Sequence, residues 1–323
     1  MRQLRRLQGM AGVGMKIFMR VLGPVMILGA NVLIGGIVYS FLWHVLPDLC
    51  EGSSALLSAH VGLGLYLLAN IFFNYMGCIS TSPGHPEPCL EPGKFLGGRT
   101  SKAADGKRVT RLNHKLQVEP GVSYRWCRHC NCIKPPRAHH DSISGRCVLD
   151  MDHYCPWMNN CVGYGNYRYF LLFMVYLLAG CLYVLAVTVL AFRGFNGKTG
   201  EGVLYYRQLH DALVYSFTVA ISASAAVAVL LLWHVYLSLT NQTIIEFYIN
   251  MEERAEAKEQ GRTYKNPFDK GWRKNLRRVF GGGGGSSACG LILLSARTPP
   301  PPEYPPLPPP GLLESKLTSQ SKV

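Results

Sequence analysis

Four long apolar segments constrain the fold of this chain more than any other feature of its sequence. They cover roughly residues 21–44, 56–78, 169–192 and 212–238, and each reaches the ~20 residues that a membrane-spanning helix needs. Of the 323 residues, 48% are hydrophobic and only 16% are charged, which is too apolar for an ordinary soluble protein of this size. We therefore predict an all-α polytopic membrane protein with four transmembrane helices.

The first apolar segment follows several basic residues, as the core of a signal peptide does. Its apolar run is longer than the 7 to 15 residues typical of a signal peptide, and no clear cleavage site of small residues follows it. We predict that this segment stays in the chain as the first transmembrane helix.

The distribution of basic residues predicts the orientation. Thirty of the 33 Lys and Arg residues lie in segments 1–20, 80–168 and 241–323, which an even number of spans places on one face. Lys and Arg accumulate on the cytosolic face, so both termini and the central loop are expected there. The formal net charge of +14 is explained by anionic lipid headgroups, and we expect no nucleic-acid partner. The predicted parts are a cytosolic N-terminus (1–20), helices one and two (21–79), a cytosolic cysteine-rich domain (80–168), helices three and four (169–240), a cytosolic tail (241–280) and a disordered Gly/Pro-rich tail (281–323).

The central loop contains the run CRHCNCIKPPRAHHDSISGRCVLDMDHYCPWMNNCVG at residues 127–163. Thiols stay reduced in the cytosol, so this density of Cys and His favours a metal site or catalysis over disulfides. Cys-x2-Cys spacing lets two thiolates bind one tetrahedral zinc ion. The predicted zinc ligands are Cys127, Cys130, His140 and Cys147, with Cys132 and His139 as nearby competitors.

Cys155 differs from these cysteines because Pro156 follows it and disfavours helical geometry at Cys155. In extended chain, alternate side chains share a side, so His153 can take the thiol proton of Cys155. Asp152 could orient that imidazole, as an acid does in a catalytic triad. The alternative is that Cys155 is a further zinc ligand and His153 a core histidine, and these residues alone would favour it.

The pattern as a whole resembles the DHHC family of protein S-acyltransferases, in a variant that reads DHYC at 152–155. The resemblance rests on C-x2-C, then KPxRAHH, then C-x4-DH-x-CPW-x-NNCVG between helices two and three. It is dense over residues 127 to about 170 and weaker to about residue 280. Ser82-Pro83-Gly84 resembles the family's DPG element. Two tail elements also resemble those of the family, namely a TTxE element with Thr243 and Glu246 and an Asn-Pro-Phe element that begins at Asn266.

The resemblance implies a two-step palmitoyltransferase reaction. Cys155 would attack palmitoyl-CoA to form an acyl-enzyme, and the acyl group would then pass to a cysteine of a membrane-associated protein. His153 would act as the base and Asp152 would orient it. Lys134, Arg137 and Trp157 are candidate contacts for acyl-CoA, with contact to lipid headgroups as the alternative for the two basic residues. An endomembrane location, Golgi or endoplasmic reticulum, is expected rather than the plasma membrane.

The sequence departs from the family at the second of its two zinc sites. The family's ligand positions there correspond to Asp141, Ser144, Tyr154 and Cys161, so three of the four ligands are replaced together. We predict one zinc ion, with hydrogen bonds and packing in place of the other. Family variants with DHYC exist, which supports activity. The alternative is a catalytically silent zinc-binding membrane scaffold, and the scarcity of ionisable residues in the spans argues against a channel or transporter.

Smaller features carry further expectations. Ala179 and Gly180 could leave room for an acyl tail, with simple helix packing as the alternative. We expect His234 to be an interfacial residue rather than a second base. Pro301 to Tyr304 fits a WW-domain ligand, and the terminal Ser321-Lys322-Val323 is a weaker candidate PDZ ligand.

Overall fold

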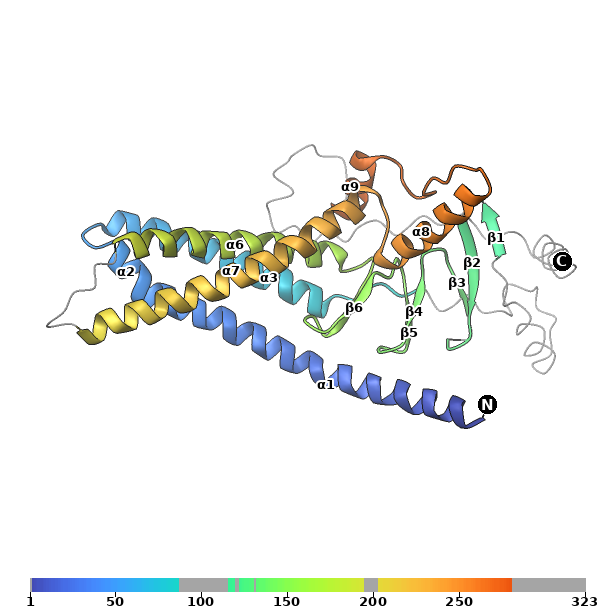
Figure 1. The fold of residues 1–323 in the computed structure, drawn as a ribbon, viewed down its shortest axis with the longest axis horizontal. Coiled ribbons are helices and arrows are strands. Elements are labelled where there is room, and N and C mark those ends of the chain that lie inside the picture. Colours follow the sequence, from blue (N-terminus) through green and yellow to red (C-terminus); the bar gives the residue numbers. More distant parts are fainter. Residues whose placement is uncertain (1, 87–115, 120–121, 131, 195–202, 281–323) are drawn as a thin grey trace, which may run out of the picture.

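The computed structural model describes residues 2–86, 116–119, 122–130, 132–194 and 203–280. Within them, four stretches of helix are long and apolar enough to cross a membrane, which confirms the predicted number. These stretches pack lengthwise as a bundle, and the cysteine-rich segment lies beyond one end of it (Figure 1). The four stretches are Gly14–Leu49, Ser54–Ser80, Tyr167–Arg193 and Leu204–Leu239.

The spanning helices begin and end outside the apolar segments that predict them. Helix α1 covers Arg2–Ser40 and continues through one π-helical turn, η1 (Phe41–Val45), into the short α2 (Leu46–Leu49). The other three are α3 (Ser54–Ser80), α6 (Tyr167–Gly194) and α7 (Val203–Leu239). Helix α7 starts well before the predicted residue 212, because Arg207, His210 and Asp211 interrupt the apolar run in its first turns.

The cysteine-rich segment forms short β-ribbons, which the sequence did not predict. One sheet has the order β1-β2-β3 and the other two are the hairpins β4-β5 and β6-β7, all antiparallel. Figure 1 shows these ribbons beside one another, with the first half of α1 running past them. The strands are β1 (Leu116–Glu119), β2 (Val122–Cys127), β3 (Cys132–Lys134), β4 (His139–Asp141), β5 (Arg146–Val148), β6 (His153–Cys155) and β7 (Asn160–Val162).

Two helices follow the last span, α8 (Ile244–Glu259) and α9 (Trp272–Phe280). Helix α8 begins at Ile244 because Thr243 and Glu246 form a capping box at its first turn. This box satisfies two backbone N–H groups that would otherwise lack a partner.

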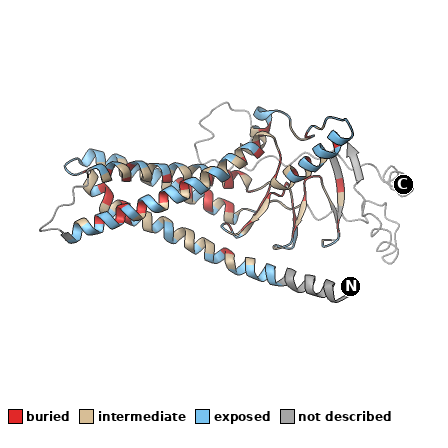
Figure 2. Cartoon of the chain, in the orientation of Figure 1, coloured by how far each residue is buried: buried red, intermediate tan, exposed pale blue. Residues whose placement is uncertain are grey.

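The packed core lies between the spans and the ribbons. Cys155, Met158 and Val162 belong to one buried cluster with Tyr75 of α3 and Phe170 of α6. Many large apolar residues on the outer faces of the helices stay exposed, as Figure 2 shows by the pale blue along the bundle. Such surfaces suit contact with lipid.

Candidate functional site

The four predicted zinc ligands meet at one point. Cys127 ends β2, Cys130 follows in the turn, and His140 and Cys147 face each other across the β4-β5 hairpin. The Sγ atoms of Cys127 and Cys130 lie 3.6 and 3.2 Å from Nδ1 of His140, and Sγ of Cys147 lies 3.6 Å from Sγ of Cys130.

These separations fit a metal ion. Ligand atoms held about 2.3 Å from a tetrahedral zinc ion lie about 3.8 Å from one another. All four ligand atoms of Cys127, Cys130, His140 and Cys147 lie within 4.8 Å of one another. The set of three sulfurs and one imidazole nitrogen is typical of structural zinc sites, so the cluster can bind zinc.

The competing residues have different surroundings. His139 points away from the cluster and lines a cavity beside α8. Burial, together with the cations of Lys134, Arg125 and Arg137, lowers the pKa of His139 to about 4. The side chain of Cys132 lies outside the described part of the structure.

Asp152, His153 and Cys155 form a connected group at the end of the bundle. Oδ2 of Asp152 lies 2.6 Å from Nδ1 of His153, and β6 places His153 and Cys155 on the same side of an extended strand. Burial alone would lower the pKa of His153, but its interactions with Asp152 and then Cys155 outweigh burial and raise that pKa to about 9. Cys155 is 7% exposed and is not part of the zinc-ligand cluster.

The first turn of α8 holds Asp152 from its other side. The backbone N–H of Ile244 donates to Oδ1 of Asp152 at 2.9 Å. Because the donor is a backbone group, the contact does not depend on the side chain of Ile244, which stands where the TTxE element has its second Thr. The partial positive charge of a helix N-terminus also favours an ionised carboxylate there.

Glu246 binds Arg137 in a bidentate ion pair, with Nε–Oε1 and Nη2–Oε2 distances of 2.6 and 2.7 Å. Nη1 of Arg137 also donates to Asn241 Oδ1, and its guanidinium lies over the ring of Phe268. Arg137 is 9% exposed. Arg137 also lines the polar cavity beside α8, but its charge is already paired with a buried carboxylate. Its role here is to join the β3-β4 loop to α8.

The other two candidates for acyl-CoA contact keep accessible side chains. Lys134 ends β3, opposite Arg125 of β2, and is half-buried. Trp157 is 49% exposed in the turn after Cys155, and its backbone carbonyl accepts a hydrogen bond from the Tyr75 hydroxyl at 2.9 Å.

The positions that correspond to the family's second zinc site make hydrogen bonds. Asp141 accepts from the backbone N–H groups of Ile143 and Ser144, at 3.0 and 2.9 Å. Tyr154 donates to Oδ1 of Asn159 at 2.9 Å. Burial raises the pKa of the Cys161 thiol, which donates to the carbonyl of His153 at 3.4 Å.

The tail elements attach to the end of α7. The amide of Asn266 donates to the carbonyl of Thr240 at 2.8 Å, and the amide of Asn275 donates to that of Leu239 at 2.7 Å. Sequence reasoning missed Asn275, which is only 1% exposed. An asparagine between the bulky residues of a basic run was the available signal. Arg278 pairs with Asp150 and ties α9 to the loop before β6.

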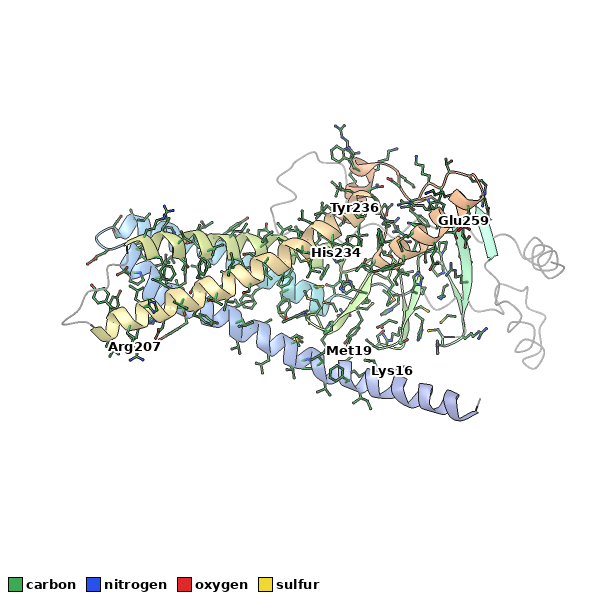
Figure 3. The ribbon with its side chains drawn as sticks, in the orientation of Figure 1. Lys16, Met19, Arg207, His234, Tyr236 and Glu259 are labelled. Atoms are coloured by element: carbon green, nitrogen blue, oxygen red, sulfur yellow. The ribbon has the colours of Figure 1, made fainter. Side chains whose placement is uncertain are left out.

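His234, expected to be an interfacial residue rather than a second base, has a side chain that is buried inside the protein. It is 2% exposed, and one of its ring nitrogens lies within 4.8 Å of the nearest ligand atoms of Asp152 and His153. Figure 3 labels His234 on α7, near the junction between the bundle and the ribbons. A histidine in a span was the available signal, but its facing direction could not be derived from sequence.

Comparisons with known proteins agree with this geometry. Residues 122–251 match the family model described as DHHC palmitoyltransferase. The chain is 40% identical over 168 residues to "Probable protein S-acyltransferase 16" of Arabidopsis thaliana, covering 52% of this chain and 58% of that protein. It is 37% identical over 159 residues to "Palmitoyltransferase ZDHHC2" of Mus musculus, covering 49% of this chain and 40% of that protein. The chain therefore spans about half the length of these two relatives.

A longer match extends beyond the cysteine-rich segment. The chain is 31% identical over 280 residues to "Probable protein S-acyltransferase 14" of Arabidopsis thaliana, covering 81% of this chain and 82% of that protein. This match includes spans and tail as well as the site. The chain belongs to the DHHC palmitoyltransferase family.

Proposed function

We propose that this chain is a protein S-acyltransferase that moves a long-chain acyl group from acyl-CoA, through a thioester on Cys155, to cysteine thiols of membrane-associated proteins. The observation that carries the proposal is the connected group Asp152, His153 and Cys155 at the end of a membrane-spanning bundle. The family membership of the chain supports it.

In the first half-reaction, His153 takes the proton of Cys155 and Asp152 stabilises the resulting imidazolium. The thiolate attacks the thioester carbonyl of acyl-CoA, and the bond from carbonyl carbon to CoA sulfur breaks. His153 then protonates the departing CoA thiolate. In the second half-reaction, His153 takes a proton from the substrate thiol, whose sulfur attacks the acyl carbonyl on Cys155. The bond from the acyl carbon to the Cys155 sulfur breaks, and His153 returns the proton to the Cys155 thiolate. Each step exchanges one thioester for another, so no nucleotide is needed.

The acyl chain requires an apolar path from Cys155 into the bundle. A cavity of about 110 Å³ lies between α1, α3 and α6, and Gly180 lines it. A methyl group at Gly180 would come within 3.2 Å of Cδ1 of Ile71, so glycine keeps this passage wider. Gly180 lies 13 residues from the start of α6 at Tyr167, about 20 Å along the helix. We propose Gly180, rather than Ala179, as the residue that leaves room for the acyl tail.

The CoA head requires cations in water. Arg125 and Lys134 are opposite residues of the β2-β3 pair. Arg125 and His139 line a polar cavity of about 330 Å³ between this ribbon, α8 and the tail. We propose that Lys134 and Arg125 bind CoA phosphates and that Trp157 contacts the molecule near the thioester, whereas Arg137 keeps its structural pair with Glu246.

The zinc-ligand cluster would hold one ion that fixes β2 through β5 and supplies folding free energy rather than chemistry. Cys127, Cys130 and Cys147 would hold the ion as thiolates and His140 as a neutral imidazole. Hydrogen bonds at Asp141, Tyr154 and Cys161 take the place of a second ion.

The charge distribution supports cytosolic termini and a cytosolic catalytic domain, with the domain boundaries predicted from the sequence. We also propose that the chain contacts anionic lipids and lies in an endomembrane. Pro301–Tyr304, which lies outside the described residues, is proposed to bind a WW-domain partner.

The test is incubation of the detergent-solubilised full chain with an alkyne analogue of palmitoyl-CoA. We expect label on the wild type that hydroxylamine removes, and none on Cys155→Ser. A Lys134→Gln, Arg125→Gln variant should keep maximal labelling and need more acyl-CoA to reach half of it. Folded wild-type protein that takes up no label would favour the silent scaffold.

A further inference from the structure

His234 lies beside the proposed catalytic base. It belongs to α7, and its ring centroid lies 5.8 Å from that of His153. Phe170 contacts both imidazoles edge-on, at 5.2 Å from His153 and 5.0 Å from His234. His153 is therefore enclosed by two rings on the side that faces the bundle, while Asp152 holds its Nδ1.

The hydrogen bonds around His234 indicate which of its nitrogens carries a proton. The hydroxyl of Ser238 donates to the carbonyl of His234 at 2.7 Å, so a hydrogen bond at its 3.3 Å contact with the Tyr167 hydroxyl is donated by Tyr167, which also lies 3.4 Å from that carbonyl. With the Tyr167 proton directed to Ser238, the 3.2 Å contact between the Tyr167 hydroxyl and Nδ1 of His234 is a hydrogen bond when Nδ1–H donates it. This is the arrangement in which all three short contacts are hydrogen bonds at once.

One proton on the ring satisfies this network. A second cation is unfavourable in this buried place 5.8 Å from the His153 ring, so His234 stays neutral beside the His153 imidazolium and its Nε2 keeps a lone pair. Nearby polar groups stabilise a cation in a buried site, where water cannot do so. His153 becomes such a cation each time it takes the Cys155 proton.

A metal ion is the other ligand chemistry that Asp152, His153 and His234 could suggest. The 2.6 Å hydrogen bond between Asp152 and Nδ1 of His153 argues against it, because that bond occupies the facing nitrogen and carboxylate oxygen. The backbone N–H of Ile244 occupies the other oxygen. The group is satisfied by hydrogen bonds.

We propose that His234 is a positioning residue for His153: with Phe170 it fixes the imidazole plane, and as a neutral polar ring it stabilises the thiolate–imidazolium pair of Cys155 and His153. Tyr167 and Ser238 select the tautomer of His234 that does this. The proposal rests on the proposed function, since it assigns His234 a part in activating the same nucleophile.

The experiment measures alkylation of Cys155 by iodoacetamide as a function of pH, quantified by mass spectrometry of the peptide that contains it. This readout needs no acyl-CoA, and the thiolate is the species that reacts. His234→Phe keeps a ring of similar size without nitrogens. We expect it to raise the midpoint pH of alkylation by half a unit or more, which slows alkylation at pH 7 about three-fold. Tyr167→Phe should shift the midpoint in the same direction by less.

The matched control is His60→Phe, which breaks another histidine–tyrosine pair, half-buried in the bundle, with His60 Nδ1 2.9 Å from Tyr183 Oη. Its alkylation profile should equal that of the wild type. An unchanged midpoint in folded His234→Phe would overturn the proposal. If that variant does not fold, by zinc content and thermal midpoint, Tyr167→Phe decides by the same criterion. Wild-type protein without acyl label but with a shifted His234→Phe profile would refute the acyltransferase function and retain the role of His234.

Discussion

Ribbons β2 to β5 gather four metal-ligand atoms around one point, whereas the corresponding place between β4 and β7 gathers hydrogen bonds around Asp141, Tyr154 and Cys161. A zinc site holds its ribbons through four strong metal–ligand bonds. The second region depends on several weaker contacts, including the packing of Cys161 with Val148 and Met151. The comparison suggests that this chain keeps its nucleophile in place with a single metal, provided that the surrounding helices contribute the rest.

Loss of one zinc ligand should have the largest effect. A structural zinc site supplies an apparent ~10–16 kcal/mol, as much as the whole stability of a typical domain, so Cys147→Ser should lose zinc and unfold the ribbons. Zinc analysis and limited proteolysis of the purified variant test this. Cys161→Ser is the matched control and should keep its zinc. Equal zinc loss in both variants would contradict the division between the two regions.

Asp152→Asn tests the region without metal by removing the negative charge that pairs with His153. A neutral amide cannot stabilise the imidazolium, so the pKa of His153 should fall from about 9 toward its ordinary 6.5. By analogy with catalytic triads, acylation should slow by on the order of 10³–10⁴-fold. In the wild type, the contribution of the Asp152–His153 pair to the free energy of unfolding is complete below pH ~6.5, and it is lost as the pH rises through about 9, the pKa of His153.

The measurement for this variant is the pH dependence of Cys155 acylation. The imidazolium-dependent limb should lie near pH 9 in the wild type and move down in the variant. A slower variant with its limb in the original place would show that Asp152 acts on the fold alone.

Rebuilding the second site would convert one region into the other. The variant Asp141→Cys, Ser144→Cys, Tyr154→His supplies three ligands to join Cys161. We expect zinc content to rise from one to two per chain and the thermal midpoint to increase, because metal binding stabilises the folded state. A count that stays at one would mean that the replaced region has lost the geometry as well as the ligands.

Asp141→Ala removes the acceptor for two backbone N–H groups of the β4-β5 turn. Asp141 is 2% exposed, whereas the turn that carries the two donors is partly exposed, so the cost is that of two ordinary hydrogen bonds. We expect a loss of about 1–3 kcal/mol in the free energy of unfolding. Denaturant unfolding of the cysteine-rich domain measures this loss. A loss below the experimental error would show that Asp141 does not stabilise the region without metal.

Tyr154→Phe should have the smallest effect. It deletes only the hydroxyl that donates to Asn159, in an exposed hydrogen bond worth about 0.5–1 kcal/mol. Acylation of Cys155 should stay near the wild-type rate. A loss of activity as large as that of Asp152→Asn would show that this hydroxyl takes part in the reaction.

The parts of this molecule that sequence predicts are those whose signal is local. Apolar length predicts the four spans, and Cys and His spacing predicts the cluster that forms. The roles of residues that are positioned by tertiary contacts were not predicted. Arg137 resembles a phosphate ligand in sequence, but its partner Glu246 lies 109 residues away. His234 and Asn275 are functional candidates only because α7 and α9 turn them inward. The β-ribbons have strands of three to six residues, too short for a periodic pattern.

The most direct test of the account is native mass spectrometry of the purified chain after incubation with palmitoyl-CoA. We expect the mass of one zinc ion and one acyl group per chain, with the acyl group on Cys155 by fragmentation and removed by hydroxylamine. Two zinc ions per chain, or an acyl group on any other cysteine, would contradict the claim that Cys155 is a nucleophile held in place by a single metal site.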